Sequence, residues 1–338
     1  MRYAMTGATG FVGGALARQL REAGHEVVAL VRDPARATAL TELGVELRPG
    51  DLDSVSALDA LTTGVDGLFH VAGWYRLGER DGAATGDRVN VQGTRNVLEA
   101  ALRNGVRRVV YTSTVAVNSD TEEQVVDETY RFTGTHISSY DRTKAAAHDV
   151  ALDFAYDGLP VVIVQPGLVY GPGDTAQTGD LIAQVVRGKR PPVPAAGGVC
   201  WAHVDDVARG HVLAMERGEP GQSYMLTGPQ IRLADGLRQV AAIAGTPGPR
   251  VLPERIVRAT AGVLGAVGKV VPLPPGYAAE TMRAGLATYY GTSERAQQEL
   301  GWRPRPLEQG LRETVEALSL IHISSPRDPK TSRMPSSA

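Results

Sequence analysis

The sequence is poor in the residues that cross-link a chain or hold a metal. Cys200 is the only cysteine among 338 residues. A single cysteine excludes an internal disulfide, and no Cys/His cluster has the spacing of a zinc site. We therefore expect no metal, and we interpret Cys200 as a small buried apolar residue rather than a nucleophile.

An excess of charge and a long apolar run are lacking as well. The 35 basic and 37 acidic residues nearly cancel, and no dense basic run could follow a nucleic-acid backbone. The most apolar segment, Ile256–Val271, contains Arg258 and Lys269 and is too short to cross a bilayer, so we expect a core helix there. The chain also opens without the pattern of a signal peptide. These features favour a cytoplasmic protein with a small-molecule partner and without a nucleic-acid or membrane partner.

The first half of the chain contains a regular alternation of short apolar, β-branched runs with helical stretches. Such alternation is typical of βαβ units around a parallel sheet. We predict an α/β fold, a doubly wound Rossmann sheet with a smaller C-terminal substrate-binding domain. The predicted strands are Arg2–Thr6, Glu26–Val31, Val45–Gly50, Gly67–Val71, Arg107–Thr112 and Pro160–Gln165, and the predicted helices are Phe11–Ala23, Ser54–Thr62, Gly86–Asn104 and Ser138–Tyr156.

The domain boundaries follow from the point where this alternation ends. After Pro166 the density of proline and glycine rises. We predict a Rossmann domain over residues 1–166, to which segments around 201–228 return. Residues 167–317 are predicted to form mainly the substrate-binding domain.

The last segment, 318–338, differs in character from the rest. Leu318–Ile323 and Ser332–Ala338 read as translations of the two ends of a transposase-based sequencing adapter. We therefore expect residues 318–338 to be a disordered tail of translated adapter sequence. The alternative is a natural polar tail, whose composition would also be disordered.

A glycine-rich turn directly follows the first predicted strand. Gly7 permits the tight turn, Gly10 lets the backbone approach a pyrophosphate, and Gly13 lets the following helix pack close to the strand. The helix N-terminus presents unpaired N–H groups to the anion. The sequence thus predicts a dinucleotide-binding turn made of Gly7, Thr9, Gly10, Phe11, Val12 and Gly13.

The end of the second predicted strand bears on which dinucleotide binds. The guanidinium of Arg32 suits a 2′-phosphate, whereas a carboxylate there would repel it. NADP(H) is therefore predicted in preference to NAD(H). Two alternatives stay open, namely that Asp33 binds the ribose or that Arg36 shares the phosphate. Asp51 and Leu52, after the third strand, are expected at the adenine edge.

Tyr140 and Lys144 are four residues apart and so lie on one face of a predicted helix. A nearby cation favours a phenolate, so we expect the pKa of Tyr140 to fall from about 10 toward working pH. Thr114, at the end of the fifth strand, is expected to orient the substrate oxygen, with Ser113 as the alternative. Tyr140, Lys144 and Thr114 are thus the predicted catalytic residues.

Together these residues resemble those of the extended short-chain dehydrogenases/reductases, the NAD-dependent epimerase/dehydratase family. Further matching motifs are Asn90–Thr94, His203–Ala208 and Gly301–Pro304. Within the family, the sequence is similar to dihydroflavonol-reductase-like proteins and to the hopanoid-associated sugar epimerase group. The resemblance implies that the cofactor contacts Val71, Ala72, Gly73, Ser113, Tyr140, Lys144, Pro166 and Val169. It also implies a homodimer paired through two helices that flank the active site.

Three functions are compatible with these residues. The first is NADPH-dependent reduction of a ketone or aldehyde on a bulky organic substrate. The second is a nucleotide-sugar epimerase or dehydratase with tightly held NAD(P), for which Arg190 and Arg232 are among the candidate diphosphate ligands. The third is a non-catalytic NADP-sensing regulator, against which the presence of both Tyr140 and Lys144 argues. For His203 and the aspartates that follow it, we expect a hydrogen-bonding role rather than metal binding.

Overall fold

The alternating segments pair into one seven-stranded sheet in the computed structural model, which describes residues 1–76, 78–79, 81–267 and 279–324. The strand order is β10-β6-β5-β4-β1-β2-β3, and every pairing is parallel. The six predicted strands and the α/β Rossmann class are confirmed. The strands are β1 Arg2–Thr6, β2 Glu26–Val31, β3 Glu46–Pro49, β4 Gly67–His70, β5 Val109–Thr112, β6 Val161–Pro166 and β10 Ser223–Leu226.

The strand order reverses beside β1, because β2 lies on one side of it and β4 on the other. Open α/β sheets bind ligands at such a switch point, outside the carboxyl ends of the strands. Thr6 ends β1 and His70 ends β4. The residues that follow these two strands therefore begin at the crevice where a ligand is expected.

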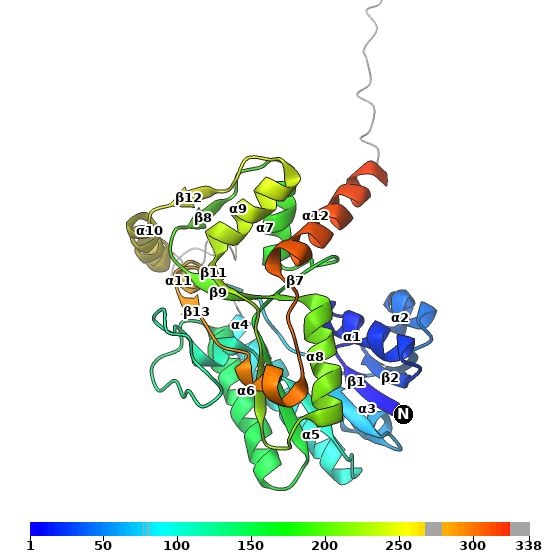
Figure 1. The fold of residues 1–338 in the computed structure, drawn as a ribbon. Helices are drawn as coiled ribbons and strands as arrows, with labels where there is room; N and C mark the ends of the chain where they lie inside the picture. The colour runs from blue at the N-terminus through cyan, green and yellow to red at the C-terminus, as the bar shows by residue number, and fades with distance from the viewer. Residues whose placement is uncertain (77, 80, 268–278, 325–338) are drawn as a thin grey trace, which may run out of the picture.

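Helices cover both faces of the sheet (Figure 1). Helices α1 (Phe11–Glu22) and α8 (Val204–Arg217) pack with Met5 of β1 in one core. Ala4 belongs to the core on the opposite face, formed with α3 (Val55–Thr62), α5 (Gly93–Arg103) and α6 (Ser139–Tyr156). Because both faces are buried, the strands read as continuous apolar runs rather than as an alternating pattern.

The predicted helix Gly86–Asn104 is not continuous. It is divided into α4 (Gly82–Gly86), a π-helical turn (Asp87–Gln92) and α5. Such turns are frequent at functional sites. This one carries the buried Asn90 side chain, which hydrogen-bonds to both backbone groups of Trp74. Hydrophobic periodicity alone gives no sign of this interruption.

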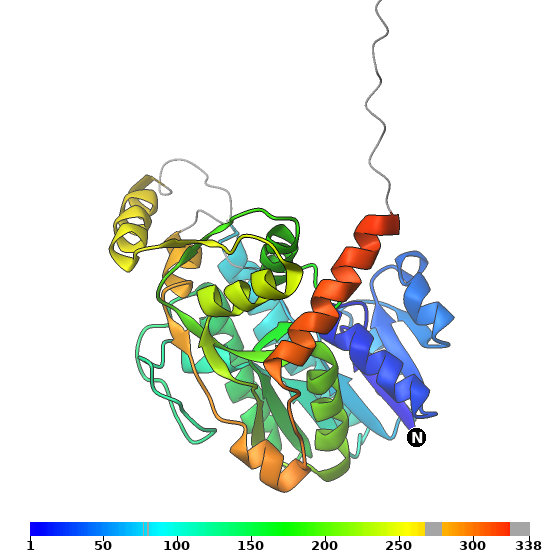
Figure 2. The same ribbon diagram turned by 45° about the horizontal axis from the view of Figure 1, so that its top comes forward.

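A smaller C-terminal lobe lies above the sheet (Figures 1 and 2). Its core includes Trp201, Leu237 and Leu311, which are almost fully buried. The lobe holds the strands β7 Leu168–Tyr170, β8 Pro192–Pro194, β9 Gly198–His203, β11 Gln230–Arg232, β12 Arg250–Leu252 and β13 Thr288–Tyr289, with the helices α7 Gln177–Val186, α9 Leu233–Ala244, α10 Glu254–Val267, α11 Ala279–Ala284 and α12 Leu307–Ser324.

Helix α10 occupies most of the segment expected to be a core helix, but only one of its faces is buried. Val257 and Ala261 are buried, whereas Ile256 is 53% and Val263 64% exposed. The expectation of a core helix is therefore wrong, because a helix at the rim of a small lobe buries only its inward stripe. Residues 268–271 of the predicted helix lie outside the described residues.

The chain crosses between the lobes more often than predicted. Helix α8 and strand β10 return to the Rossmann lobe, although β9 belongs to the small lobe. A later return was not predicted, since Ala296, Leu300 and Trp302 are buried in the same core as α1 and α8. The Rossmann lobe therefore draws on residues well beyond 228.

The end of α12 differs from the expected disordered tail. The helix continues through Ser324, and its last turns point away from both lobes (Figures 1 and 2). Leu318 is half-buried against the small-lobe core, and this packing explains why the helix continues past Ala317. Leu320, two residues further on, is 67% exposed. Residues 325–338 lie outside the described residues.

Removal of residues 318–338 is expected to leave the melting temperature within about 3 °C of that of the full chain, since Leu318 is the one removed residue, among those whose side chains are described, that packs against the small-lobe core. Thermal unfolding of the two chains, followed by circular dichroism, measures the difference. A much larger fall would show that the segment belongs to the natural fold and would contradict the adapter interpretation.

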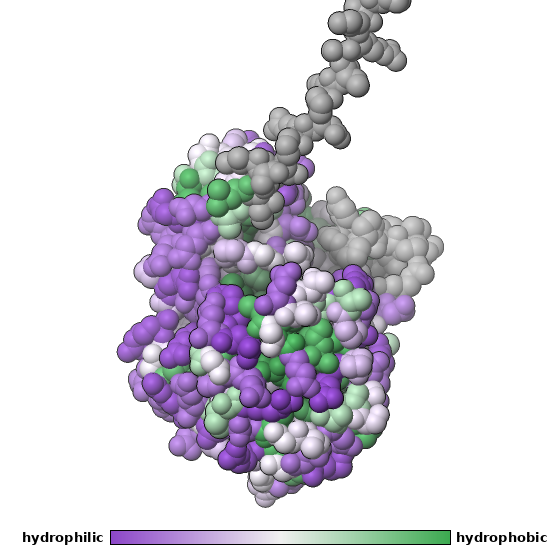
Figure 3. All heavy atoms as spheres, turned by 90° about the vertical axis from the view of Figure 1, so that its right-hand side faces the viewer, coloured by the Kyte–Doolittle hydropathy of each residue, from purple (hydrophilic) through white to green (hydrophobic). Residues whose placement is uncertain are grey.

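The side of the molecule on which α1 and α2 (Thr38–Glu42) lie is mainly hydrophilic, with apolar residues gathered near its middle (Figure 3). Within the described ranges, no helix has both the length and the apolarity needed to span a bilayer.

Candidate functional site

The glycine-rich turn between β1 and α1 has the geometry that its sequence predicts. Gly7 has φ +74°, and a Cβ there would lie 2.5 Å from the Ala72 amide nitrogen. A Cβ on Gly13 would lie 2.1 Å from the Gly7 carbonyl oxygen. Both distances are far below van der Waals contact, so only glycine permits this approach of the turn to the loop after β4 and of α1 to the turn.

The N-terminus of α1 fits an anionic ligand. Gly10 is the N-cap residue, no side chain caps the helix, and its first turn contains no acidic residue. The helix therefore presents its first N–H groups and the positive end of its dipole at the crevice. Thr9 is exposed beside this end, and Phe11 and Val12 are half-buried. A pyrophosphate is the group that suits this cradle.

The charged residues after β2 differ in how they are held. Asp33 caps a short 3₁₀ turn (Pro34–Arg36), since its carboxylate accepts the Ala35 N–H at 3.1 Å. Arg32 and Arg36 are exposed, and within the described part of the chain no hydrogen bond or ion pair engages either guanidinium. The Asp33 carboxylate is thus engaged with the turn, whereas the two guanidinium groups point to no described partner.

Two loops at the carboxyl edge bring further predicted residues to the crevice. After β3, Asp51 is exposed, and the Leu52 carbonyl oxygen accepts a hydrogen bond from the Asn96 amide at 2.8 Å. After β4, the Ala72 N–H donates to the Thr6 hydroxyl at 3.3 Å.

The loop after β4 also reaches the predicted catalytic helix. Val71 begins this loop with an N–H that donates to the Thr6 carbonyl oxygen at 3.3 Å. A Cβ on Gly73 would lie 3.8 Å from the Lys144 ammonium nitrogen. The predicted ribose contacts and the predicted catalytic lysine thus meet at one point of the crevice.

Tyr140, Lys144 and Thr114 are brought together where α6 begins. A hydrogen bond joins the Thr114 hydroxyl to the Tyr140 phenol. The Lys144 ammonium donates to the Thr112 carbonyl oxygen at 2.8 Å and to the Tyr111 hydroxyl at 3.1 Å. It also lies 4.8 Å from the centre of the Tyr111 ring. The cluster therefore combines two hydroxyls and a buried amine.

The pKa of Tyr140 differs from the sequence-based expectation. Burial raises the pKa of Tyr140 to about 12, although the Thr114 hydrogen bond opposes the shift. Burial also lowers the pKa of Lys144 to about 7. Near neutral pH the lysine is thus only partly charged, and the pKa of Tyr140 lies above its usual value rather than below it as expected. The consequence is that Tyr140 stays protonated at neutral pH and is able to donate a proton.

Ser113 lies next to the cluster but is held by a different partner. Its hydroxyl is 2.9 Å from Nδ1 of His148, and both residues are buried. Burial lowers the pKa of His148 to about 4, so this imidazole is neutral. Because the Ser113 hydroxyl is engaged there, Thr114 is favoured over Ser113 as the hydroxyl beside Tyr140.

Pro166 ends β6, and Val169 follows it in β7. Pro166 is buried at the end of that strand, and Val169 is half-buried in β7, opposite Ala202 of β9. This segment connects the two lobes, so residues expected beside the nicotinamide sit where the chain first leaves the Rossmann sheet.

The sequence did not predict a buried chain of hydrogen bonds that runs from Thr6 to Lys144. Nδ1 of His70 lies 2.7 Å from the Thr6 hydroxyl, and its Nε2 lies 3.0 Å from the Thr94 hydroxyl. Thr94 in turn is hydrogen-bonded to Tyr111, which accepts a bond from Lys144. Thr94 ends the motif Asn90–Thr94 and His70 directly precedes the predicted contact Val71, but spacing alone gave neither of them a role.

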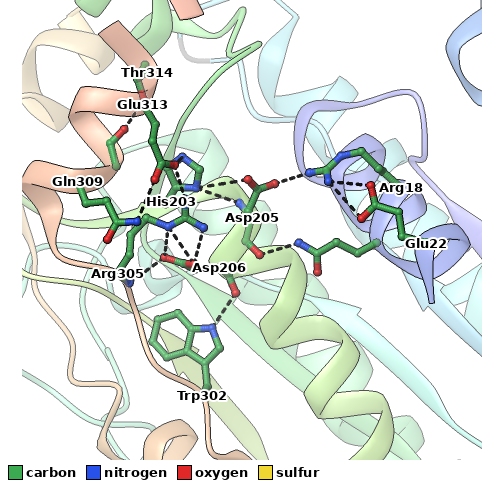
Figure 4. Close-up of polar contacts among 12 residues, drawn as sticks. Arg18, Glu22, His203, Asp205, Asp206, Trp302, Arg305, Gln309, Glu313 and Thr314 are labelled. Carbon is green, nitrogen blue, oxygen red and sulfur yellow. Dashed lines mark hydrogen bonds and ion pairs between the residues drawn. The ribbon is translucent and has the colours of Figure 1, made fainter. Parts of the chain in front are cut away.

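His203 and its neighbours form an ionic cluster between the lobes (Figure 4). Asp206 binds Arg305 at 2.8 Å, and Asp205 binds Arg18 of α1 at 2.6 Å. Nε2 of His203 is buried without a hydrogen bond, 3.7 Å from a Glu313 oxygen. Among the described residues no group of His, Cys, Asp and Glu is arranged to hold a metal ion. The cluster ties α1, α8 and α12 together.

Comparison with known proteins agrees with these features. A family model described as the NAD dependent epimerase/dehydratase family matches residues 3–226. A putative dihydroflavonol 4-reductase from Synechocystis sp. is 35% identical over 92% of this chain and 92% of its own. A 2-alkyl-3-oxoalkanoate reductase from Stenotrophomonas maltophilia is 30% identical over 92% of this chain and 98% of its own.

Solved structures share the architecture across both lobes. A crystal structure of a nucleoside-diphosphate-sugar epimerase from Pseudomonas aeruginosa superposes with a TM-score of 0.77 and 26% identity. The match covers 95% of this chain and 98% of that chain. The similarity therefore extends well beyond the Rossmann sheet.

Proposed function

Because the chain belongs to the NAD-dependent epimerase/dehydratase family and is thus an NAD(P)-dependent enzyme, we propose that it is an NADPH-dependent reductase of a ketone or aldehyde on a bulky organic substrate. The observation that carries this proposal is the buried Tyr140, protonated at neutral pH and hydrogen-bonded to Thr114 beside Lys144. A protonated phenol suits proton donation to a carbonyl oxygen. The two reductases among the relatives support the same direction of reaction.

The residues at the crevice would hold the cofactor in one orientation. The glycine turn and the N-terminus of α1 would bind its pyrophosphate, and Arg32 its 2′-phosphate. Asp51 and Leu52 would border the adenine. The residues assigned to the ribose and nicotinamide side are Val71, Ala72, Gly73, Ser113, Tyr140, Lys144, Pro166 and Val169.

The chemistry would then divide among three side chains. The bound reduced nicotinamide supplies a hydride to the carbonyl carbon. The Thr114 hydroxyl holds the carbonyl oxygen, and Tyr140 transfers its phenolic proton to that oxygen, so that an alcohol forms. The charged form of Lys144 stabilises the phenolate left behind until a proton from solvent restores Tyr140.

Arg32→Ala is expected to weaken NADPH binding by about tenfold or more while changing NADH binding little, because only the 2′-phosphate loses a charge-assisted hydrogen bond. Titration of nicotinamide fluorescence measures both affinities. Arg36→Ala is the matched control, since Arg36 is equally exposed nearby. A larger loss in Arg36→Ala would move the phosphate contact to that residue.

The same titration distinguishes the second candidate function. The similarity to a sugar epimerase favours a nucleotide-sugar epimerase or dehydratase as the alternative. The chain's own arginines support it little, since Arg232 pairs with Glu123 at 3.7 Å and Arg190 donates to the Gly248 carbonyl oxygen. NAD that co-purifies with the protein, with no preference for NADPH, would favour the epimerase. Exchangeable NADPH would favour the reductase.

A further inference from the structure

The buried ammonium of Lys144 has no counter-ion. Lys144 is 5% exposed, and among the described residues no carboxylate pairs with it. The titratable groups around it are Tyr140 on α6, Tyr111 on β5, His70 on β4 and His148, one turn further along α6. Burial keeps both imidazoles neutral, since it lowers the pKa of His70 to about 3 and that of His148 to about 4. The charged lysine is therefore stabilised by neutral groups alone.

Strand β5 supplies the neutral groups that hold this ammonium. The Tyr111 hydroxyl accepts one N–H at 3.1 Å, and the Thr112 carbonyl oxygen accepts a second at 2.8 Å. The ammonium also lies 4.8 Å from the centre of the Tyr111 ring, within the range of a cation–π interaction. An ammonium has three N–H groups. The third is thus left for a group bound in the crevice beside Gly73, where a Cβ would lie 3.8 Å from the nitrogen.

The two residues that accept these bonds are anchored from opposite faces of the sheet. Tyr111 belongs to the core beneath α5 and α6, and its hydroxyl is hydrogen-bonded there to Thr94 of α5. Thr112 faces the other side, where its hydroxyl lies 2.8 Å from Nε2 of His211 on α8. The position of both acceptors is therefore set by the layers of the fold rather than by the lysine.

A row of polar side chains crosses the sheet to Tyr111. Thr6, His70 and Tyr111 are register partners on β1, β4 and β5, and all three are fully buried. The ring centres of His70 and Tyr111 are 5.5 Å apart. His70 lies between the hydroxyls of Thr6 and Thr94, at 2.7 and 3.0 Å. Buried polar groups are costly unless they satisfy one another, so this connected row calls for a reason, and it ends at the hydroxyl that holds Lys144.

We propose that Tyr111 is a positioning residue that holds the Lys144 ammonium, charged and directed at the crevice, through its hydroxyl and its ring. The proposal rests on the proposed function, in which the charged lysine stabilises the Tyr140 phenolate. Tyr111 needs no contact with substrate or cofactor for this role. Without its hydroxyl the ammonium keeps a single acceptor, and a buried charge so poorly compensated gives up its proton more readily.

The test reads the charge of Lys144 in the cofactor-free protein. Lysine labelled with ¹³C at Cε is titrated by NMR, and only Lys189, Lys269 and Lys330 share the label. Lys144→Met identifies the resonance. Tyr111→Phe keeps the ring but removes the hydroxyl. Burial lowers the pKa of Lys144 to about 7 in the wild type. We expect the variant to lower it by about one further unit, a tenfold rise in the ionisation constant.

Tyr224→Phe is the matched control, because Tyr224 is a fully buried tyrosine of the same sheet whose hydroxyl donates to Glu299 instead. It should leave the Lys144 titration unchanged. The pH profile of turnover gives a second readout. At pH 8, Tyr111→Phe should be about tenfold slower than the wild type, and the difference should shrink toward pH 5, where the lysine regains its charge.

An unchanged Lys144 titration in Tyr111→Phe, or an equal shift in Tyr224→Phe, overturns the proposal. Should Tyr111→Phe fail to fold, Thr94→Val decides, since it leaves Tyr111 in place but removes the hydroxyl that fixes it. The proposal then requires a smaller fall in the Lys144 pKa, and the absence of any fall contradicts it. A protein with the expected titration but no carbonyl reduction would refute only the proposed function.

Discussion

Tyr140→Phe is expected to lower turnover of a carbonyl substrate by about two orders of magnitude or more, because the variant keeps the ring but has no proton to give. The Tyr140 phenol is the protonated group hydrogen-bonded to Thr114, so its hydroxyl is the part that the reaction uses. NADPH affinity should change by less than about threefold, since the glycine turn and Arg32 are untouched. Steady-state kinetics and fluorescence titration measure the two quantities.

Tyr130→Phe is a suitable control for this substitution. Tyr130 lies in the loop between β5 and α6 and packs against a small apolar cluster that includes Val115 and Met225. Loss of its hydroxyl should leave turnover nearly unchanged. Equal turnover in Tyr140→Phe and the wild type would remove Tyr140 from the mechanism and leave the NADP-sensing regulator as the better explanation of the fold.

Lys144→Met is expected to abolish most turnover while making the protein more stable. The variant cannot stabilise the phenolate, so kcat should fall by about a hundredfold or more. Burial lowers the folded-state pKa of Lys144 to about 7, whereas the unfolded chain keeps the ordinary value near 10.5. Folding below about pH 7 must therefore bury a poorly compensated charge.

The sign of the stability change follows from this pKa difference. Between pH 7 and about 10 the unfolded chain binds more protons than the folded one, so the wild-type free energy of unfolding should rise with pH in that window. At pH 6 the penalty is fully present, and Lys144→Met should raise the free energy of unfolding by about 1–3 kcal/mol. Urea unfolding at pH 6 and pH 9 measures both effects. A variant that is less stable at pH 6 would contradict the burial of an unfavourable charge.

Much of the Rossmann lobe could be predicted because local and global signals agree there. Strands buried on both faces form continuous apolar runs, and the glycine turn fixes where the first strand ends. The approach of Gly13 to the Gly7 carbonyl oxygen is a direct consequence of that pattern. The return of Trp302 to the same core could not be predicted, because it depends on a contact with Asp206 that is remote in sequence.

The sequence predicted which residues of the candidate site would lie together, but it did not predict their electrostatics. Spacing brought Tyr140 and Lys144 onto one helix face, and the strand end supplied Thr114. The expected fall in the Tyr140 pKa was wrong, because spacing does not reveal that burial raises the pKa of Tyr140 and lowers that of Lys144. The hydrogen bond from the Tyr289 hydroxyl to the Asp141 carboxylate joins residues far apart in the chain, so the sequence alone could not predict it.

The central claim is that the protein carries out net reduction of a carbonyl group with NADPH. The most direct measurement incubates the wild-type protein with NADPH and a panel of bulky ketones and aldehydes, and compares the NADPH oxidised with the alcohol formed. A reductase will oxidise NADPH and form the alcohol in equal amounts for at least one member of the panel, and Tyr140→Phe will remove this activity. Interconversion of a sugar nucleotide by tightly held cofactor, with no net oxidation of NADPH by any carbonyl compound, would contradict the claim.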